Sequence, residues 1–153
     1  MGEAPGAEED RCGLPFRGRS GRFLDEALGR VGLAREDVFI TSSVKCRPPG
    51  NRDPRDEELR TCRAAWLDPQ LELLDPEVVV TLGLVPARLL LGERRPLGRF
   101  HGRWRRHSGR LWLPTYHPAA AMRFPAARRG FRADLAKLAG WLASQDRPRA
   151  PRG

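Results

Sequence analysis

The chain has 153 residues, a hydrophobic fraction of 40% and a formal net charge of +9 at pH 7, a size that suits one compact domain. No apolar run reaches the roughly 18 residues of a membrane span, and an acidic start with three cysteines is not typical of a secreted disulfide framework, so we expect a cytoplasmic protein. The charge predicts a nucleic-acid partner, although arginine beside abundant Ala, Gly, Pro and Leu is equally typical of a codon bias.

The first half of the chain predicts a loop, two helices and a strand. Residues 2–20 are rich in Gly, Pro and acids and predict an extended loop. Apolar residues at helical spacing predict a helix over 20–33, and the β-branched run over 37–44 predicts a buried strand. Asp53 before a proline predicts the N-cap of the next helix, which Pro69 should kink or restart.

The second half predicts the rest of an α/β domain. Its clearest strand is the unalternating apolar run over 76–83, a pattern that favours a parallel sheet covered on both faces. A short helix, a hairpin turning at Ser108-Gly109 and a last helix follow over 85–92, 103–116 and 129–144. Strands alternating with helices predict a three-layer α/β domain over residues 1–145, and residues 146–153 predict a disordered basic tail.

Three stretches have the residue types of a ligand site. They are "GEAPGAEEDRCGLPFRG" over 2–18, "TSSVKCRPPGNRDP" over 41–54 and "TYHPAAAMR" over 115–123. Each is a weak signal alone, because Gly-Pro turns and His-Pro helix entries are common. Together with "VVVTLG", in this order and spacing, they resemble the family 4 uracil-DNA glycosylases, the iron–sulfur branch of their superfamily, over roughly residues 2–140.

The resemblance implies a fold and an activity. It implies a three-layer α/β/α fold with a short, mostly parallel four-stranded sheet, whose first, central strand precedes Gly2, so we expect the chain to be truncated at its N-terminus relative to the family. It also implies a monomeric DNA repair enzyme that hydrolyses the N-glycosidic bond of uracil in DNA, releasing uracil and leaving an abasic site. Such an enzyme must flip the nucleotide into a pocket.

The chemistry of that pocket requires an aromatic face, a hydrogen-bond donor for the departing base and a carboxylate. The resemblance implies that Phe16 stacks on uracil and that His117 donates to uracil O2. It implies Glu9 as the carboxylate that positions water, with Glu3 as the runner-up. From the residues alone, Phe16 could be core, His117 a buried hydrogen-bonded imidazole and the acids a solvated rim.

The remaining site residues also follow from the resemblance. Gly2 and Ala4 would contact the base, and Arg123 would lie near the phosphates or fill the gap left by the flipped base. Ser42 stands where the family usually has an asparagine, whose amide offers both a donor and an acceptor to the uracil edge. A serine hydroxyl is shorter and cannot copy that pair of contacts, which predicts weak activity or a drifted substrate preference.

The cysteines suggest half of a metal site. In the family, the positions of Cys46 and Cys62 are two of the four thiolate ligands of a [4Fe–4S] cluster, and the other two precede Gly2. Cys12 is at a position that commonly has no ligand. We therefore expect the cluster to be incomplete or absent in this chain.

A DNA-binding remnant without catalytic activity is the alternative function. Seven arginines lie between Arg94 and Arg110 with Phe100 and Trp104 among them, a pattern suited to backbone contact and stacking on unpaired bases. An ordinary exposed hairpin explains the same pattern equally well.

Overall fold

A short mixed β-sheet forms the centre of the molecule. The computed structural model describes residues 1–145, so the predicted tail at 146–153 lies outside the described residues. The sheet contains β1 (Val78–Leu82), β2 (Arg105–His107) and β3 (Arg110–Thr115) in the order β1-β3-β2. β1 runs parallel to β3 with Val80 opposite Leu113, and β2 is antiparallel to β3.

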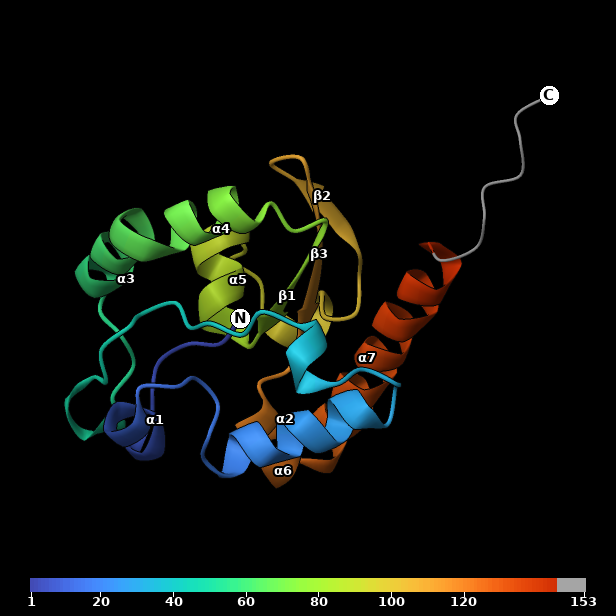
Figure 1. Ribbon diagram of the computed structural model, residues 1–153, viewed down its shortest axis with the longest axis horizontal. Helices are drawn as coiled ribbons and strands as arrows, with labels where there is room; N and C mark the ends of the chain where they lie inside the picture. The colour runs from blue at the N-terminus through green and yellow to red at the C-terminus, as the bar shows by residue number, and fades with distance from the viewer. Residues whose placement is uncertain (146–153) are drawn as a thin grey trace.

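Helices cover both faces of this sheet, as the predicted three-layer architecture requires (Figure 1). On one face lie α2 (Arg19–Gly29), α6 (Pro118–Arg123) and α7 (Pro125–Gln145), whose core includes Leu24, Phe131 and Leu135. On the other face lie α4 (Asp68–Leu74) and α5 (Leu84–Leu91), around the cluster Leu67, Val79, Leu90 and Trp112. Alternate β1 side chains enter opposite cores, which explains why the apolar run of this strand does not alternate.

The predicted strand over 37–44 is wrong, and the sheet of the described residues has three strands, β1, β3 and β2. The segment follows the 3₁₀ turn η1 (Arg35–Asp37) and forms one isolated parallel bridge, between Gly2 and Ser42. Gly2 N donates to Thr41 O at 2.8 Å, and Ser43 N donates to Gly2 O at 2.9 Å. A β-branched run becomes a strand only where a partner pairs along its length, and within residues 1–145 the long-range backbone bonds of this run go to Gly2 and Glu3 alone.

One unpredicted helix and one shifted helix start also differ from the predictions. The stretch 2–20 includes a short helix, α1 (Ala7–Cys12), and the helix expected at Asp53 begins two residues beyond Pro54, as α3 (Asp56–Cys62). α3 continues through a π-helical turn, η3 (Arg63–Leu67), into α4. Pro69 lacks the N–H that an α-helical ladder requires, and the wider π turn lies one turn before it.

The other elements follow the predictions closely. The hairpin turns at Ser108 and Gly109, whose φ angles of 48° and 77° are the left-handed values of a tight hairpin turn. α7 begins at Pro125, four residues before the predicted start, and two further 3₁₀ turns are η2 (Pro49–Asn51) and η4 (Leu97–Arg99). Among the described helices, none combines the length and apolarity that a membrane crossing needs.

Candidate active site

The turn that presents Phe16 is held in an unusual backbone conformation. Phe16 is 6% exposed and has a φ of 53°, a left-handed value that costs a non-glycine residue about 1–3 kcal/mol. The Arg35 guanidinium donates to Pro15 O at 2.5 Å and to Phe16 O at 3.2 Å, and pairs with Asp25 at 2.8 Å. A Cβ on Gly21 would lie 1.9 Å from Phe16 O, so only glycine allows α2 to approach this turn.

His117 is held as a neutral imidazole at the start of α6. Its Nδ1 accepts a hydrogen bond from Ala119 N at 3.1 Å, so in the neutral ring the proton resides on Nε2. Burial, and secondarily the positive Met1 terminus, lower the pKa of His117 to about 4. Gly83, directly after β1, has a φ of 101°, and a Cβ at this position would lie 3.3 Å from the His117 Cβ. Glycine therefore allows the end of β1 to lie close to His117. At neutral pH the ring is therefore an uncharged Nε2–H donor.

A buried polar network fixes the strand end that leads to His117. Asp134, which is 1% exposed, accepts a hydrogen bond from Thr115 Oγ1 at 2.7 Å and pairs with His101 Nδ1 at 2.8 Å. These contacts connect the last residue of β3 to α7. They restrict where the following His117 can lie, because a fully satisfied buried network allows few alternatives.

Four of the predicted site residues come together. The rings of Phe16 and His117 have centroids 5.6 Å apart and are tilted by 32°. Gly2 lies against the Phe16 ring, and Ser42, which is 6% exposed, pairs with Gly2 through the parallel bridge. Among the described residues none hydrogen-bonds the Ser42 hydroxyl, so this group is available to a ligand.

We predict that Gly2→Ala lowers activity through the Phe16 ring. A Cβ at residue 2 would lie 2.5 Å from Phe16 Cζ, a distance at which the ring must move. We expect at least a tenfold loss of kcat/KM in an assay of base release, which corresponds to about 1.4 kcal/mol. Gly140→Ala is the control, because a Cβ at that position in α7 meets nothing within 4 Å. Equal activity of both variants would contradict the close approach of Gly2 and Phe16.

The two candidate carboxylates have different surroundings. Glu9 Oε1 accepts from the backbone N of Arg17 and Gly18 at 2.7 and 2.8 Å, and Oε2 accepts from Gly6 N at 3.1 Å. Burial opposes ionisation, but these hydrogen bonds outweigh it and lower the pKa of Glu9. Glu3 is half-buried, and burial followed by the charge of Asp53 raises its pKa. Glu9 thus organises the loop around Phe16, whereas among the described residues none donates to the Glu3 carboxylate.

The last two predicted contacts lie at the margin of this group. Ala4 is half-buried in the loop between Glu3 and α1. Arg123 is exposed at the end of α6, with its guanidinium carbon 5.2 Å from the centre of the Phe124 ring, which is itself 52% exposed. Their roles toward a substrate stay predictions.

Comparison with known proteins decides the family. The Uracil DNA glycosylase superfamily model matches residues 1–139. The chain belongs to the uracil-DNA glycosylase superfamily. It is 45% identical over 150 residues to a Type-4 uracil-DNA glycosylase of Pyrobaculum aerophilum, covering 92% of this chain and 75% of the relative. It is 39% identical to the Type-4 enzyme of Archaeoglobus fulgidus, covering 97% and 77%.

This chain is also similar in fold to a solved structure. The crystal structure of wild-type Pedobacter heparinus SMUG2 matches with a TM-score of 0.50 and 14% identity, covering 97% of this chain and 75% of that chain. At this identity the likeness shows the α/β fold alone. The fold class expected from the sequence is confirmed.

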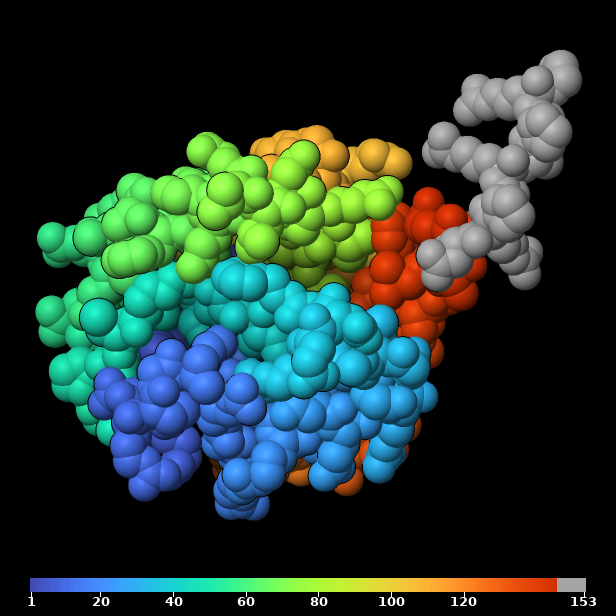
Figure 2. All heavy atoms as spheres, viewed as in Figure 1, coloured from blue at the N-terminus to red at the C-terminus, as the bar shows by residue number. Residues whose placement is uncertain are grey.

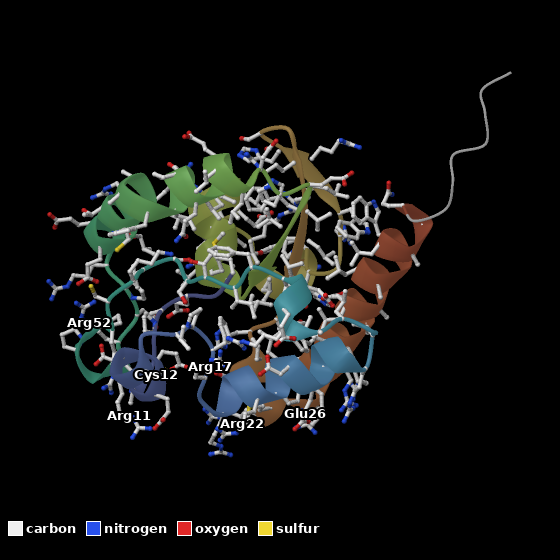
Figure 3. All side chains as sticks on the ribbon, viewed as in Figure 1. Arg11, Cys12, Arg17, Arg22, Glu26 and Arg52 are labelled. Carbon is white, nitrogen blue, oxygen red and sulfur yellow. The ribbon has the colours of Figure 1, made fainter. Side chains whose placement is uncertain are left out.

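The described part of this glycosylase-superfamily chain does not supply a complete cluster site. Cys46 is exposed and Cys62 is half-buried, while Cys12 lies on α1 with its Sγ 3.8 Å from Leu14 O (Figure 3). Within residues 1–145, no three His, Cys, Asp or Glu side chains are grouped as a metal site would need. Two thiols do not fit a cluster held by four thiolates.

The arginine-rich stretch of the glycosylase-like domain is largely structural. Phe100 is fully buried, and the Arg95 and Arg105 guanidiniums lie over its ring at 5.9 and 5.7 Å. Both arginines pair with the buried Glu93 carboxylate, at 2.7 and 2.9 Å. Phe100 is therefore unavailable for stacking on bases, which favours the ordinary-hairpin interpretation for these residues.

Sequence reasoning missed three groups that shape this glycosylase-family site. Arg35 lies outside all three motifs, and no local pattern indicates that it holds the Phe16 turn. Asp134 is in the middle of a helix, where burial of a carboxylate has no sequence signal. Gly83 could have been found, because a glycine directly after a buried strand often allows a close approach.

Proposed function

We propose that this protein is a uracil-DNA glycosylase that hydrolyses the N-glycosidic bond of deoxyuridine in DNA. The observation that carries the proposal is the pairing of a buried aromatic ring, Phe16, with a neutral Nε2–H donor, His117, at 5.6 Å between ring centres. Membership of the superfamily and the Type-4 relatives support it. The products are free uracil and an abasic site.

His117 stabilises the departing base. As the glycosidic bond breaks, negative charge develops on uracil and positive charge on the sugar. A flipped uracil stacked on Phe16 brings its O2 to the His117 Nε2–H, which strengthens its hydrogen bond as that charge grows. A neutral donor transfers no proton and needs no titration near pH 7, since the pKa of His117 is about 4. One such donor contributes about 2.7–4 kcal/mol to a transition state of this kind.

We infer different roles for the two carboxylates. Three of the roughly four acceptor positions of Glu9 are already used by backbone N–H groups, so it holds the loop that carries Phe16. Glu3 adjoins Gly2 and keeps its acceptor positions, so it is the better placed of the two to orient water toward the sugar cation.

Paired substitutions test this assignment. Glu3→Gln should lower kcat at least tenfold without changing the thermal midpoint of unfolding, because no protein contact of Glu3 is lost. Glu9→Gln should lower the midpoint by a few degrees and raise KM, because an amide oxygen accepts these backbone N–H groups less strongly. The reverse outcome, a folded but inactive Glu9→Gln protein beside an active Glu3→Gln protein, would restore Glu9 as the water-positioning group.

The DNA substrate would dock on the side of the molecule that carries α1, α2 and α6. Arg17 and Arg22 lie where α1 gives way to α2 (Figure 3), and both are exposed. Among the described residues neither these two nor Arg123 has a carboxylate partner, so all three are available to phosphates. The paired Arg123 and Phe124 side chains could enter the stack vacated by the flipped nucleotide. We propose that the protein acts as a monomer.

An iron–sulfur cluster would have a structural role here, apart from this chemistry. We propose that Cys46 and Cys62 hold a [4Fe–4S] cluster only if two further thiolates are supplied from outside the described residues. When bound, such a cluster would stabilise the loop and helix that carry these cysteines. The steps above use neither thiol.

The test is excision from a labelled oligonucleotide that contains one uracil. Abasic sites, revealed by alkaline cleavage at that position and not in a thymine-containing control, are the expected result. The alternative, a DNA-binding remnant, is favoured by Ser42 in place of the asparagine. It predicts binding of both oligonucleotides with no cleavage of either, which would overturn the proposed function.

A further inference from the structure

Lys45 follows the turn that carries Ser42, and its ammonium group bonds entirely within the molecule. Its Nζ donates to Thr41 Oγ1 at 2.6 Å, to Ser42 O at 2.7 Å and to Gln70 Oε1 at 3.1 Å. The Thr41 hydroxyl donates to the same Gln70 oxygen at 3.0 Å. An ammonium has three donors, so none is left for a phosphate or for a base. The side chain therefore serves the turn rather than the docking of DNA.

The contacts of Lys45 join two separate elements. Thr41 and Ser42 belong to the extended segment after η1, whereas Gln70 is on α4, 25 positions beyond Lys45. In Figure 2 the teal residues that follow this segment lie directly beneath the green residues of α3 and α4. A charge partly removed from water costs free energy unless its donors are bonded, and charge-assisted hydrogen bonds are roughly twice as strong as neutral ones. The half-buried ammonium thus fastens the turn to the helix.

The turn held in this way carries two sides of the proposed pocket. Ser42, Ser43 and Val44 are all buried. Ser43 donates to Gly2 O twice, from its backbone N and from its hydroxyl, each at 2.9 Å. Val44 N donates to Glu3 O at 3.1 Å. A shift of the turn would therefore move the residue at the base edge, Ser42, together with the backbone of Glu3.

We propose that Lys45 is a positioning residue for base recognition, which sets where the side chain of residue 42 meets the uracil edge by bonding Thr41, Ser42 and Gln70 at once. This role rests on the proposed uracil excision. Lys45 does not contact the base, because its donors are already used, so its effect on the substrate passes through residue 42. Two residues of one hydrogen-bond network do not act independently, and their coupling can be measured.

A double-mutant cycle between Lys45→Met and Ser42→Asn measures this coupling on the oligonucleotide with one uracil. Methionine keeps most of the length of the lysine side chain and removes all three donors. We expect Ser42→Asn to raise excision about 10- to 100-fold in the parent chain and less than about threefold beside Lys45→Met. His117→Ala should cause the same loss in both backgrounds, because His117 lies at the start of α6 and not in this turn.

Lys137→Met is the matched control, at the second lysine of the chain. Lys137 also donates to a backbone oxygen, Gly102 O at 2.8 Å, but on α7. The gain from Ser42→Asn should be undiminished beside it. Gln70→Leu removes one acceptor of Lys45 and keeps the ammonium, so it should reduce the gain about threefold. This variant decides the question if Lys45→Met does not fold.

Three results would overturn the role of Lys45. They are an undiminished gain beside Lys45→Met, no gain from Ser42→Asn in any background, and an equal weakening of the Ser42→Asn and His117→Ala effects, which would show that the lysine is merely structural. Free uracil, titrated by NMR against the same proteins, gives the comparison without bond cleavage. Ser42→Asn should tighten uracil binding about fivefold or more in the parent chain and not beside Lys45→Met. That pattern without excision would overturn the proposed activity alone, and absence of both excision and uracil binding would overturn both proposals.

Discussion

Replacing His117 by alanine lowers the rate of uracil excision about 100- to 1000-fold and leaves the affinity for uracil-containing DNA nearly unchanged. The imidazole donates to a base oxygen whose charge appears only as the bond breaks, so its loss is felt in the transition state. Single-turnover excision and equilibrium binding, measured on one oligonucleotide, separate the two effects.

His107→Ala is the matched control for this variant. His107 is exposed on β2, and its side chain only approaches the edge of the Trp112 ring, at 6.4 Å between centroids. We expect wild-type excision from it. Parallel losses of binding and rate in His117→Ala would show that the histidine is structural, as the N-cap of α6 would allow.

Replacing Ser42 by asparagine raises uracil excision by one to two orders of magnitude. Ser42 is 6% exposed and its hydroxyl is unclaimed by the described residues, whereas an amide would read the uracil edge through a donor and an acceptor. Each net hydrogen bond contributes about 0.5–1.5 kcal/mol, and unpaired groups in a buried site cost more. At about 1.4 kcal/mol per tenfold change, two such bonds account for the predicted gain.

The same variant should also discriminate better between uracil and other bases. Competition with thymine- and hypoxanthine-containing oligonucleotides measures this, and Ser144→Asn, at an exposed position on α7, is the control. An unchanged rate would mean that water already replaces the amide. A fall in rate would mean that the pocket is shaped around serine and that uracil is not its preferred base.

The helices and β1 could be predicted because their signals are local. Apolar spacing marks α2 and α7, and an unbroken apolar run marks β1. The segment 37–44 has an equally strong local signal, but a strand needs a partner along its length, and Gly2 and Glu3 pair with only one end of it. The sequence did not predict α1. The Glu9 carboxylate on this helix accepts hydrogen bonds from the backbone N–H groups of Arg17 and Gly18, and no short sequence pattern relates these residues.

The types of residue in the site could be predicted better than their geometry. Resemblance to a family indicated Phe16 and His117, which are 101 positions apart in the chain and 5.6 Å apart between ring centres in the structure. The contacts that hold these two residues in place could not be predicted from the sequence. The Arg35 contact to Pro15 and the Asp134 contact to Thr115 depend on how α2 and α7 pack, which no single stretch of sequence specifies.

Nitrogen-15 NMR of His117 between pH 3 and 8 tests most directly whether the fold presents a neutral Nε2–H donor to the base. We predict the Nε2–H tautomer at pH 7 and titration with a pKa of about 4, caused by burial and the nearby Met1 terminus. Because the unfolded chain binds this proton first, with a pKa of about 6.5, the free energy of unfolding should also fall as the pH drops from about 6.5 toward 4. A ring that is protonated at pH 6, or neutral with its proton on Nδ1, would contradict the account.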